Sequence, residues 1–277
     1  MDNLRFGTAG IPFSTKQRNT INGIKRVKEL GLDAMELEFV RGINITKDKT
    51  PEVKRVTSEN DVILTCHSPY FINLNSDDKK KYYASISYIK NSAIITSLCG
   101  GYSICFHPGF YQKIDLKKVY EKIKEAIKTI VNSVKDEGHE IWIRPETAGK
   151  ITQFGNLNEL FNLSSELDMV LPCIDFSHLH AITNGKYNSK DEFREIFILM
   201  EKKLGRKALD NVHFHCQGIE YSEKGEKWHL NLKDSDFRFM ELLNVWKEFK
   251  LKGIVICESP NIEEDALLLK NEYKKIL

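Results

Sequence analysis

Short, β-prone runs alternate eight times with longer stretches whose apolar residues recur at helical spacing. The predicted strands cover residues 4–8, 34–39, 62–67, 102–107, 140–146, 170–175, 211–215 and 253–258. The predicted helices cover residues 19–30, 76–98, 115–135, 157–167, 190–204, 234–249 and 263–276. Repeated strand–helix units favour a closed α/β barrel of the (β/α)8 type, the TIM barrel, over an open doubly wound sheet. No G-x-G-x-x-G motif follows the first strand, which also counts against a dinucleotide-binding fold.

The 277 residues fit one barrel, since this fold typically needs about 250. No low-complexity linker divides the chain, so we expect a single domain over residues 1–277. The 41 Lys and Arg residues nearly balance 39 Asp and Glu residues, so a nucleic-acid partner would have to meet a local basic surface or bound metal ions. Residues 1–10 do not resemble a signal peptide, and no apolar run reaches about 18 residues. We therefore expect a cytoplasmic protein without membrane contact, and the sequence indicates no protein partner.

Six predicted strands end at a side chain that commonly binds metal ions. These are His67, His107, Glu146, Asp175, either His213 or His215, and Glu258. The segment L-P-C-I-D-F-S-H-L-H at residues 171–180 adds His178 and His180. Because the carboxyl ends of barrel strands line one mouth, where the active sites of this fold lie, we expect these side chains to meet. Imidazoles and carboxylates suit Zn²⁺, Mn²⁺ or Fe²⁺, and so many ligands indicate more than one ion. Paired ions about 3.5–4 Å apart are common in phosphoryl chemistry.

The six cysteines form no C-x-x-C pair and most lie in apolar runs, which is typical of small buried side chains in a reducing compartment. Cys105 and Cys173 each lie two residues before a predicted ligand and therefore share its strand face. We expect them to pack beneath the site, with a thiolate ligand as the alternative. Arg144 shares the parity of Glu146 and must be paired inside the barrel, either with a carboxylate or with a substrate phosphate.

Seven segments, taken in order, resemble the endonuclease IV family of zinc-dependent nucleases, which are xylose isomerase-like barrels that act at abasic sites in DNA. They begin at His67 (H-S-P-Y-F-I-N-L), Phe106 (F-H-P-G), Glu146 (E-T-A-G), Cys173 (C-I-D-F-S-H), His213 (H-F-H), Trp228 (W-H) and Cys257 (C-E-S-P). The resemblance implies a TIM barrel that holds two or three Zn²⁺ ions, Mn²⁺ being the other ion to consider. It also implies hydrolysis of the phosphodiester 5′ to an abasic site in double-stranded DNA, as in base excision repair.

The resemblance also implies a ligand set. The implied ligands are His67, His107 and Glu146 for the first ion, Glu146, Asp175, His213 and Glu258 for the second, and His178 and His229 for the third. Glu146 is also the implied catalytic residue, which positions the attacking water and helps to deprotonate it.

Two departures from the family's pattern affect the ligands. The family has an aspartate two residues before its last histidine, but this chain has Lys227 there, so Glu226 is the candidate substitute. His180 and His215 are further imidazoles that could compensate or could contact the ligands. The family reads E-N-T-A-G where this chain reads P-E-T-A-G, so a gapless match places Glu146 at the family's asparagine.

Two residues are expected to contact DNA. Tyr70 matches a family residue that inserts at the lesion, as aromatic wedges do. The family's Asn, Gln and Arg cluster after the second strand is replaced by V-R-G-I-N-I-T at residues 40–46, which leaves Arg41. The simpler alternatives are that Tyr70 covers the barrel mouth and that Arg41 lies on a solvated loop.

Two other functions are consistent with the sequence. Sugar isomerases and epimerases of the same barrel superfamily hold one Mn²⁺-type ion with Glu, Asp, His and Glu, which Glu146, Asp175, His213 and Glu258 would supply. Such an enzyme would have no need for the further histidines of the first and third sites. A catalytically impaired protein that binds abasic DNA is the other alternative. The near-neutral charge counts against it, because its affinity would rest on few phosphate contacts.

Overall fold

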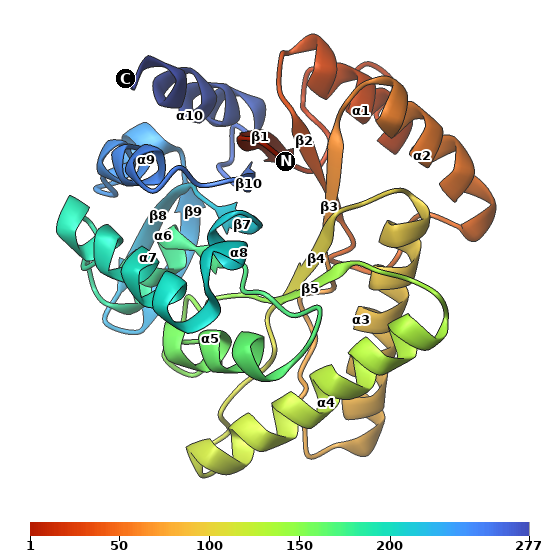
Figure 1. Ribbon diagram of the computed structural model, residues 1–277, viewed down its shortest axis with the longest axis vertical. Coiled ribbons are helices and arrows are strands. Elements are labelled where there is room, and N and C mark those ends of the chain that lie inside the picture. Colours follow the sequence, from red (N-terminus) through yellow and green to blue (C-terminus); the bar gives the residue numbers. More distant parts are fainter. Residues whose placement is uncertain (277) are drawn as a thin grey trace.

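A computed structural model describes residues 1–276, and its centre is a barrel of eight parallel strands (Figure 1). The strands are β1 Leu4–Ala9, β2 Ala34–Glu38, β3 Ile63–His67, β4 Ser103–Phe106, β5 Trp142–Pro145, β6 Ile174–Asp175, β7 Val212–His215 and β10 Gly253–Cys257. Their order is β5-β4-β3-β2-β1-β10-β7-β6. Parallel bridges from Ile143 to Val170 and from Glu146 to Cys173 join β5 to the segment that leads into β6 and close the ring. The predicted TIM barrel is confirmed.

The barrel strands are buried almost throughout, as expected where helices cover a parallel sheet. In β10, with the sequence G-I-V-I-C, every residue is buried. A Cβ at Gly7 would lie 2.1 Å from the backbone oxygen of Ala34, so the close approach of β1 to β2 requires glycine. All eight predicted strands are present. The sixth is shorter than predicted, because only Ile174 and Asp175 pair with β7.

Helices surround the strands (Figure 1). They are α1 Thr20–Glu29, α2 Thr50–Glu59, α3 Lys79–Leu98, α4 Leu116–Asp136, α5 Leu157–Glu166, α6 Phe176–Ile182, α7 Lys190–Leu204, α8 Arg206–Leu209, α9 Phe239–Glu248 and α10 Glu263–Lys275. The seven predicted helices are found, and α2, α6 and α8 are additional. The α6 helix begins directly after β6, and the Asp175 side chain accepts a hydrogen bond from the backbone N–H of His178 as its N-cap. No described helix is both long and apolar enough to cross a lipid bilayer.

The segment after β7, which lies outside every predicted strand and helix, is a β-hairpin of β8 Gly218–Ser222 and β9 Gly225–Leu230. Ser222 pairs with Gly225, which adopts a positive φ of 93° next to a two-residue turn. A bridge from Gly225 to Lys150 ties the hairpin to the loop after β5. The hairpin therefore stands at the mouth of the barrel, beside the carboxyl ends of β5 and β6.

Candidate metal centre

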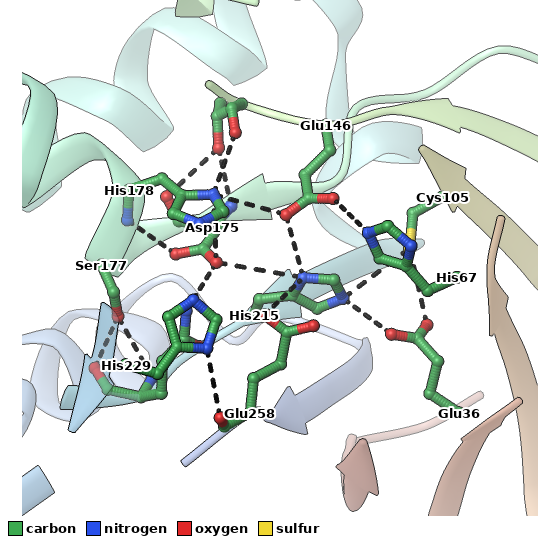
Figure 2. Close-up of polar contacts among 12 residues, drawn as sticks. Glu36, His67, Cys105, Glu146, Asp175, Ser177, His178, His215, His229 and Glu258 are labelled. Atoms are coloured by element: carbon green, nitrogen blue, oxygen red, sulfur yellow. Dashed lines mark hydrogen bonds and ion pairs between the residues drawn. The ribbon is translucent and has the colours of Figure 1, made fainter. Parts of the chain in front are cut away.

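Glu146 follows β5, and four imidazoles surround its carboxylate, of which Figure 2 shows those of His67, His178 and His215. Its Oε2 lies 3.1 Å from Nε2 of His67 and 3.6 Å from Nε2 of His107. Its Oε1 lies 3.1 Å from Nδ1 of His215 and 3.4 Å from Nδ1 of His178. The side chain is only 1% exposed. Each carboxylate oxygen thus faces a different pair of imidazoles, which is the arrangement that a bridging ligand requires.

A second group of donors joins Glu146 to Asp175, His215 and Glu258, whose ligand atoms all lie within 4.8 Å of one another. The position of His215 follows from the sheet register, which pairs it directly with Asp175. His213 lies two residues deeper in the barrel, and its Nε2 is 3.1 Å from Oε2 of Glu36. The expectation that His213 accompanies Asp175 and Glu258 is therefore corrected, because His215 occupies that place.

A third group of donors contains His178, Glu226 and His229. The Glu226 carboxylate lies 3.7 Å from Nε2 of His178 and 3.6 Å from Nε2 of His229. Glu226 thus supplies the carboxylate that the family has at the position of Lys227. The Lys227 amine instead lies 3.4 Å from a Glu220 oxygen and 5.6 Å from the ring centroid of Trp228.

A β-bulge explains why Glu226, and not Lys227, faces the site. Glu220 pairs with Trp228 and Tyr221 pairs with Glu226, so Lys227 has no partner across the hairpin. In a regular strand, residues 227 and 229 would share a face. The extra residue shifts this parity by one, which places Glu226 on the face of His229.

His180 lies outside these groups. Residues two apart on a helix point about 200° apart around its axis, so α6 cannot direct both His178 and His180 to the mouth. The Nε2 of His180 lies 3.0 Å from Oδ1 of Asp236, and its Nδ1 lies 2.9 Å from the Lys186 carbonyl oxygen. The expectation that His180 could complete the third site is corrected, since Asp236 and the Lys186 carbonyl hold it elsewhere.

Sequence reasoning missed two glutamates of β2. Glu36 is fully buried, and its carboxylate lies 3.0 Å from Nε2 of His215 and 3.1 Å from Nε2 of His213. Glu38 is two residues closer to the mouth and therefore shares the lumen face. The signal was present in the pattern A-M-E-L-E-F, because both faces of a barrel strand are buried and paired acids must then face the lumen.

Arg144 is paired with neither a carboxylate nor an open phosphate site. Its guanidinium donates to the carbonyl oxygens of Pro172 and Asn211 and lies 5.5 Å from the ring centroid of Tyr102. It therefore closes the barrel below the ligand groups. Cys105 and Cys173 are fully buried beneath the site, as expected.

The imidazoles of the metal-free site differ in protonation. Burial lowers the pKa of His107 to about 4, which leaves a neutral ring. Burial also disfavours charge on His67, but the hydrogen bond and charge of Glu146 outweigh this and raise its pKa to about 10. Burial and the charge of Glu36 raise the pKa of Glu38 to about 8. Because metal ligands must be deprotonated, an ion that binds here displaces protons.

These shifts predict that the metal-free protein loses stability as the pH rises from 6.5 to 8. His67 and Glu38, with pKa values raised to about 10 and about 8, bind more protons when folded than when unfolded across this window. His178 and His215, also with raised pKa values, act in the same direction. Cys173 and His107, whose pKa values fall to about 6 and about 4, oppose them with a smaller total. We expect the free energy of unfolding to fall by at least about 1 kcal/mol, since one proton is worth about 1.4 kcal/mol per pH unit.

Urea denaturation in the presence of a chelator would measure this change. The zinc-loaded protein is the control, and its stability should vary less with pH because the ions replace the protons. A free energy of unfolding that is constant or rises between pH 6.5 and 8 in the metal-free protein would contradict the prediction.

The rim of the mouth carries exposed aromatic side chains. Tyr70 follows β3 and is 65% exposed, and Trp228 of the hairpin is 57% exposed. The backbone N–H of Tyr70 donates to the Val40 carbonyl, which places Tyr70 beside the loop that carries the exposed Arg41. The two residues expected to contact DNA are therefore neighbours on the rim and free to meet a ligand that covers the mouth.

Comparison with known sequences agrees with this architecture. Residues 24–274 match the family described as xylose isomerase-like TIM barrel. The chain is 39% identical over 273 residues to a protein of Methanocaldococcus jannaschii described as uncharacterized, with 99% of this chain and 98% of the relative covered. It is 25% identical over 219 residues to a probable endonuclease 4 of Staphylococcus epidermidis, with 76% of this chain and 71% of the relative covered.

Solved structures with the same fold include enzymes of two kinds. Endonuclease IV from Thermus thermophilus superimposes with a TM-score of 0.76 at 15% identity, covering 96% of this chain and 97% of that chain. A D-tagatose 3-epimerase-like protein gives a TM-score of 0.72 at 16% identity, covering 97% of this chain and 96% of that chain. Identities this low show a shared fold only. Since the family match spans most of its length, the chain belongs to the xylose isomerase-like TIM barrel family.

Proposed function

We propose that the protein is a zinc-dependent endonuclease that hydrolyses the phosphodiester 5′ to an abasic site in double-stranded DNA. The observation that carries the proposal is the third donor group, His178, Glu226 and His229, next to the ligand groups that share Glu146. Three adjacent sites suit in-line phosphoryl chemistry, in which several positive charges stabilise the attacking and leaving oxygens. The similarity to endonuclease IV in sequence and fold supports the same reaction.

The residues present fit zinc. The group of Asp175, His215, Glu258 and Glu146 supplies four imidazole and carboxylate donors, and the group of His178, Glu226 and His229 supplies three. His67 and His107 both face Oε2 of Glu146. Zn²⁺ binds such donors in catalytic sites that keep a position for water or substrate. His67 and His107 would hold one ion with Glu146. Asp175, His215 and Glu258 would hold the second, also with Glu146. The third would lie between His178, Glu226 and His229.

Bound Zn²⁺ would supply a water nucleophile at neutral pH and positive charge for the phosphate oxygens. Glu146 orients the attacking water and accepts its proton, since its carboxylate is buried among imidazoles and points to the centre of the groups. The charge of the imidazole neighbours holds the pKa of Glu146 well below its usual range despite burial, so the carboxylate is ionised and able to accept a hydrogen bond. Tyr70 and Arg41 at the rim would hold the duplex beside the lesion.

A sugar isomerase or epimerase is the second candidate, because Glu146, Asp175, His215 and Glu258 form a four-donor group without the remaining histidines. Metal analysis and two activity assays separate the candidates. Two or three zinc ions with incision of a duplex that carries one abasic analogue would support the nuclease, and Asp175→Ala is the inactive control. One manganese ion with interconversion of ketose sugars would support the epimerase and reject the nuclease. Tight binding of the abasic duplex without incision would instead support the impaired binding protein.

Tyr70→Ala should weaken binding of an abasic duplex by about 5-fold or more, because an aromatic side chain stacked on a base contributes about 1–3 kcal/mol. Tyr83→Ala is a matched control, since Tyr83 on α3 is also 65% exposed. Fluorescence anisotropy with duplexes with and without the abasic analogue would measure both affinities. Equal losses for the two variants, or no loss for Tyr70→Ala, would remove Tyr70 from the DNA interface.

A further inference from the structure

A second cluster of potential ligands lies below the three groups, inside the barrel. It consists of Cys105 on β4, Cys173 before β6, and His213 and His215 on β7, whose ligand atoms all lie within 4.8 Å of one another. All four side chains are fully buried. Cys105, His213 and His215 lie on barrel strands, and Cys173, directly before β6, is bridged to Glu146, so the barrel backbone positions all four.

Two atoms at this cluster are buried without a hydrogen-bond partner among the described residues. One is Nε2 of His213, although Oε2 of Glu36 is only 3.1 Å away, and the other is Oε1 of Glu36, although Nε2 of His215 is 3.0 Å away. These pairs are close enough to hydrogen-bond but are not aligned to do so. Buried polar atoms are normally paired, and donors that converge side by side without pairing are typical of a ligand set around an ion.

The other ring nitrogen of His213, Nδ1, has a hydrogen-bond partner that leaves Nε2 available as a metal ligand. Its Nδ1 lies 3.0 Å from Oγ of Ser103. When Nδ1–H donates to this hydroxyl, Nε2 is left with its lone pair directed into the cluster. Histidines that bind metals usually have their second nitrogen fixed in this way.

We infer that Cys105, Cys173, His213 and His215 form a buried Cys₂His₂ site for a single Zn²⁺-class ion. Two thiolates and two imidazoles are the donor set of tetrahedral structural zinc, whereas every group at the mouth includes a carboxylate, and only the group of His67, Cys105 and Glu146 includes a sulfur. Bond lengths of about 2.0–2.3 Å place tetrahedral ligand atoms about 3.3–3.8 Å apart. The Sγ of Cys105 is already 3.8 Å from Nε2 of His215, so the cluster needs only a small contraction.

Figure 2 shows the ring of His215 with Glu146 and Asp175 on one side and Glu36 and Cys105 on the other. Its Nε2 faces Glu36 and Cys105, and its Nδ1 lies 3.1 Å from Oε1 of Glu146. An ion held below through Nε2 would therefore fix the orientation of a ligand of the mouth. With ions at both positions, His215 would bridge them as an imidazolate that has lost both ring protons. The buried site has a structural role that does not depend on which reaction the mouth performs.

X-ray absorption of the zinc-loaded wild-type protein tests the site without any substitution. We expect a sulfur shell at about 2.3 Å from zinc beside the shells of nitrogen and oxygen. A spectrum that contains only nitrogen and oxygen neighbours would overturn the inference.

Substitution of cobalt for zinc gives a second test. Cobalt bound by thiolates has a charge-transfer band in the near ultraviolet, which should be lost in Cys105→Ala and Cys173→Ala together with one equivalent of metal. Cys99→Ala is the matched control, since Cys99 is equally buried but lies at the end of α3, and it should keep both. Glu258→Gln should keep the thiolate band, because Glu258 belongs to the mouth. A band of unchanged intensity in both cysteine variants would overturn the inference, and the incision assay independently tests the proposed nuclease.

Discussion

Replacing Glu146 by glutamine is expected to reduce incision at an abasic site by about 10³-fold or more. Glutamine keeps the size of the side chain but removes the negative charge that the neighbouring donor groups share and the group that accepts the proton of the attacking water. A positioned general base alone contributes about 10²–10⁴-fold, and the loss of a shared ligand adds to this. Single-turnover incision with excess enzyme, together with metal analysis of the purified variant, would measure both effects.

Glu159→Gln provides the control. Glu159 is also partly buried and hydrogen-bonded, but it accepts from the Asn156 backbone as part of a capping box at the start of α5. Glutamine is accepted at this position of a capping box, so the variant should fold, bind metal and incise as the wild type does. If Glu146→Gln retained incision within 10-fold of this control, Glu146 would not be the catalytic residue.

The barrel could be predicted because its signal is repeated along the whole chain. Six of the eight strands combine a short apolar run with a ligand-type residue at the carboxyl end, and these ends meet at one mouth of the fold. His67, His107, Glu146, Asp175 and Glu258 were placed in this way, and the structure has all of them at the mouth. At these positions the residue pattern of each strand and the topology of the barrel lead to the same placement. Details of side-chain packing were therefore not needed to predict it.

The choice between His213 and His215 could not be made in the same way. The two residues share a strand face, and only their depth in the barrel differs, by about 6.6 Å at 3.3 Å per residue. That depth depends on the register between β6 and β7, which pairs Asp175 with His215. Register results from packing across the whole sheet, and no short motif encodes it.

Whether His178 and His180 both reach the mouth depends on the secondary structure of the short segment that carries them, which is the helix α6. As part of an extended segment, His178 and His180 would have shared a face, whereas a helix separates them by about 200°. The hydrogen bond from the His178 backbone to the Asp175 side chain marks the start of this helix. An aspartate that can cap the backbone three residues later is a helix-start signal, but here the same aspartate was also a candidate ligand.

The bulge in β9 is the least predictable feature and the one with the most direct consequence for the third donor group. A hairpin that paired regularly would present Lys227 and His229 to His178, and a cation there would repel a metal ion. The unpaired Lys227 shifts the strand by one residue, so that the carboxylate of Glu226 takes the place. The acid therefore lies three residues before His229 and not two, and the β-bulge brings it to the same face of the strand.

Glu226→Gln is accordingly expected to lose one metal equivalent and to reduce incision by about 10²–10³-fold, the usual effect of removing one group that stabilises charge in the transition state. Lys227→Met, at the adjacent position, should leave both unchanged, because its amine contacts only Glu220 and the ring of Trp228. Metal analysis and single-turnover incision would compare the two variants.

A double variant sharpens the comparison. Glu226→Gln combined with Lys227→Asp restores an acid two residues before His229, the spacing of the endonuclease IV family. In the bulged strand this aspartate points away from His178, so neither the ion nor the activity should return. Recovery of incision in the double variant would show that β9 pairs without the bulge, and equal activity of Glu226→Gln and Lys227→Met would show that the third donor group takes no part in the reaction.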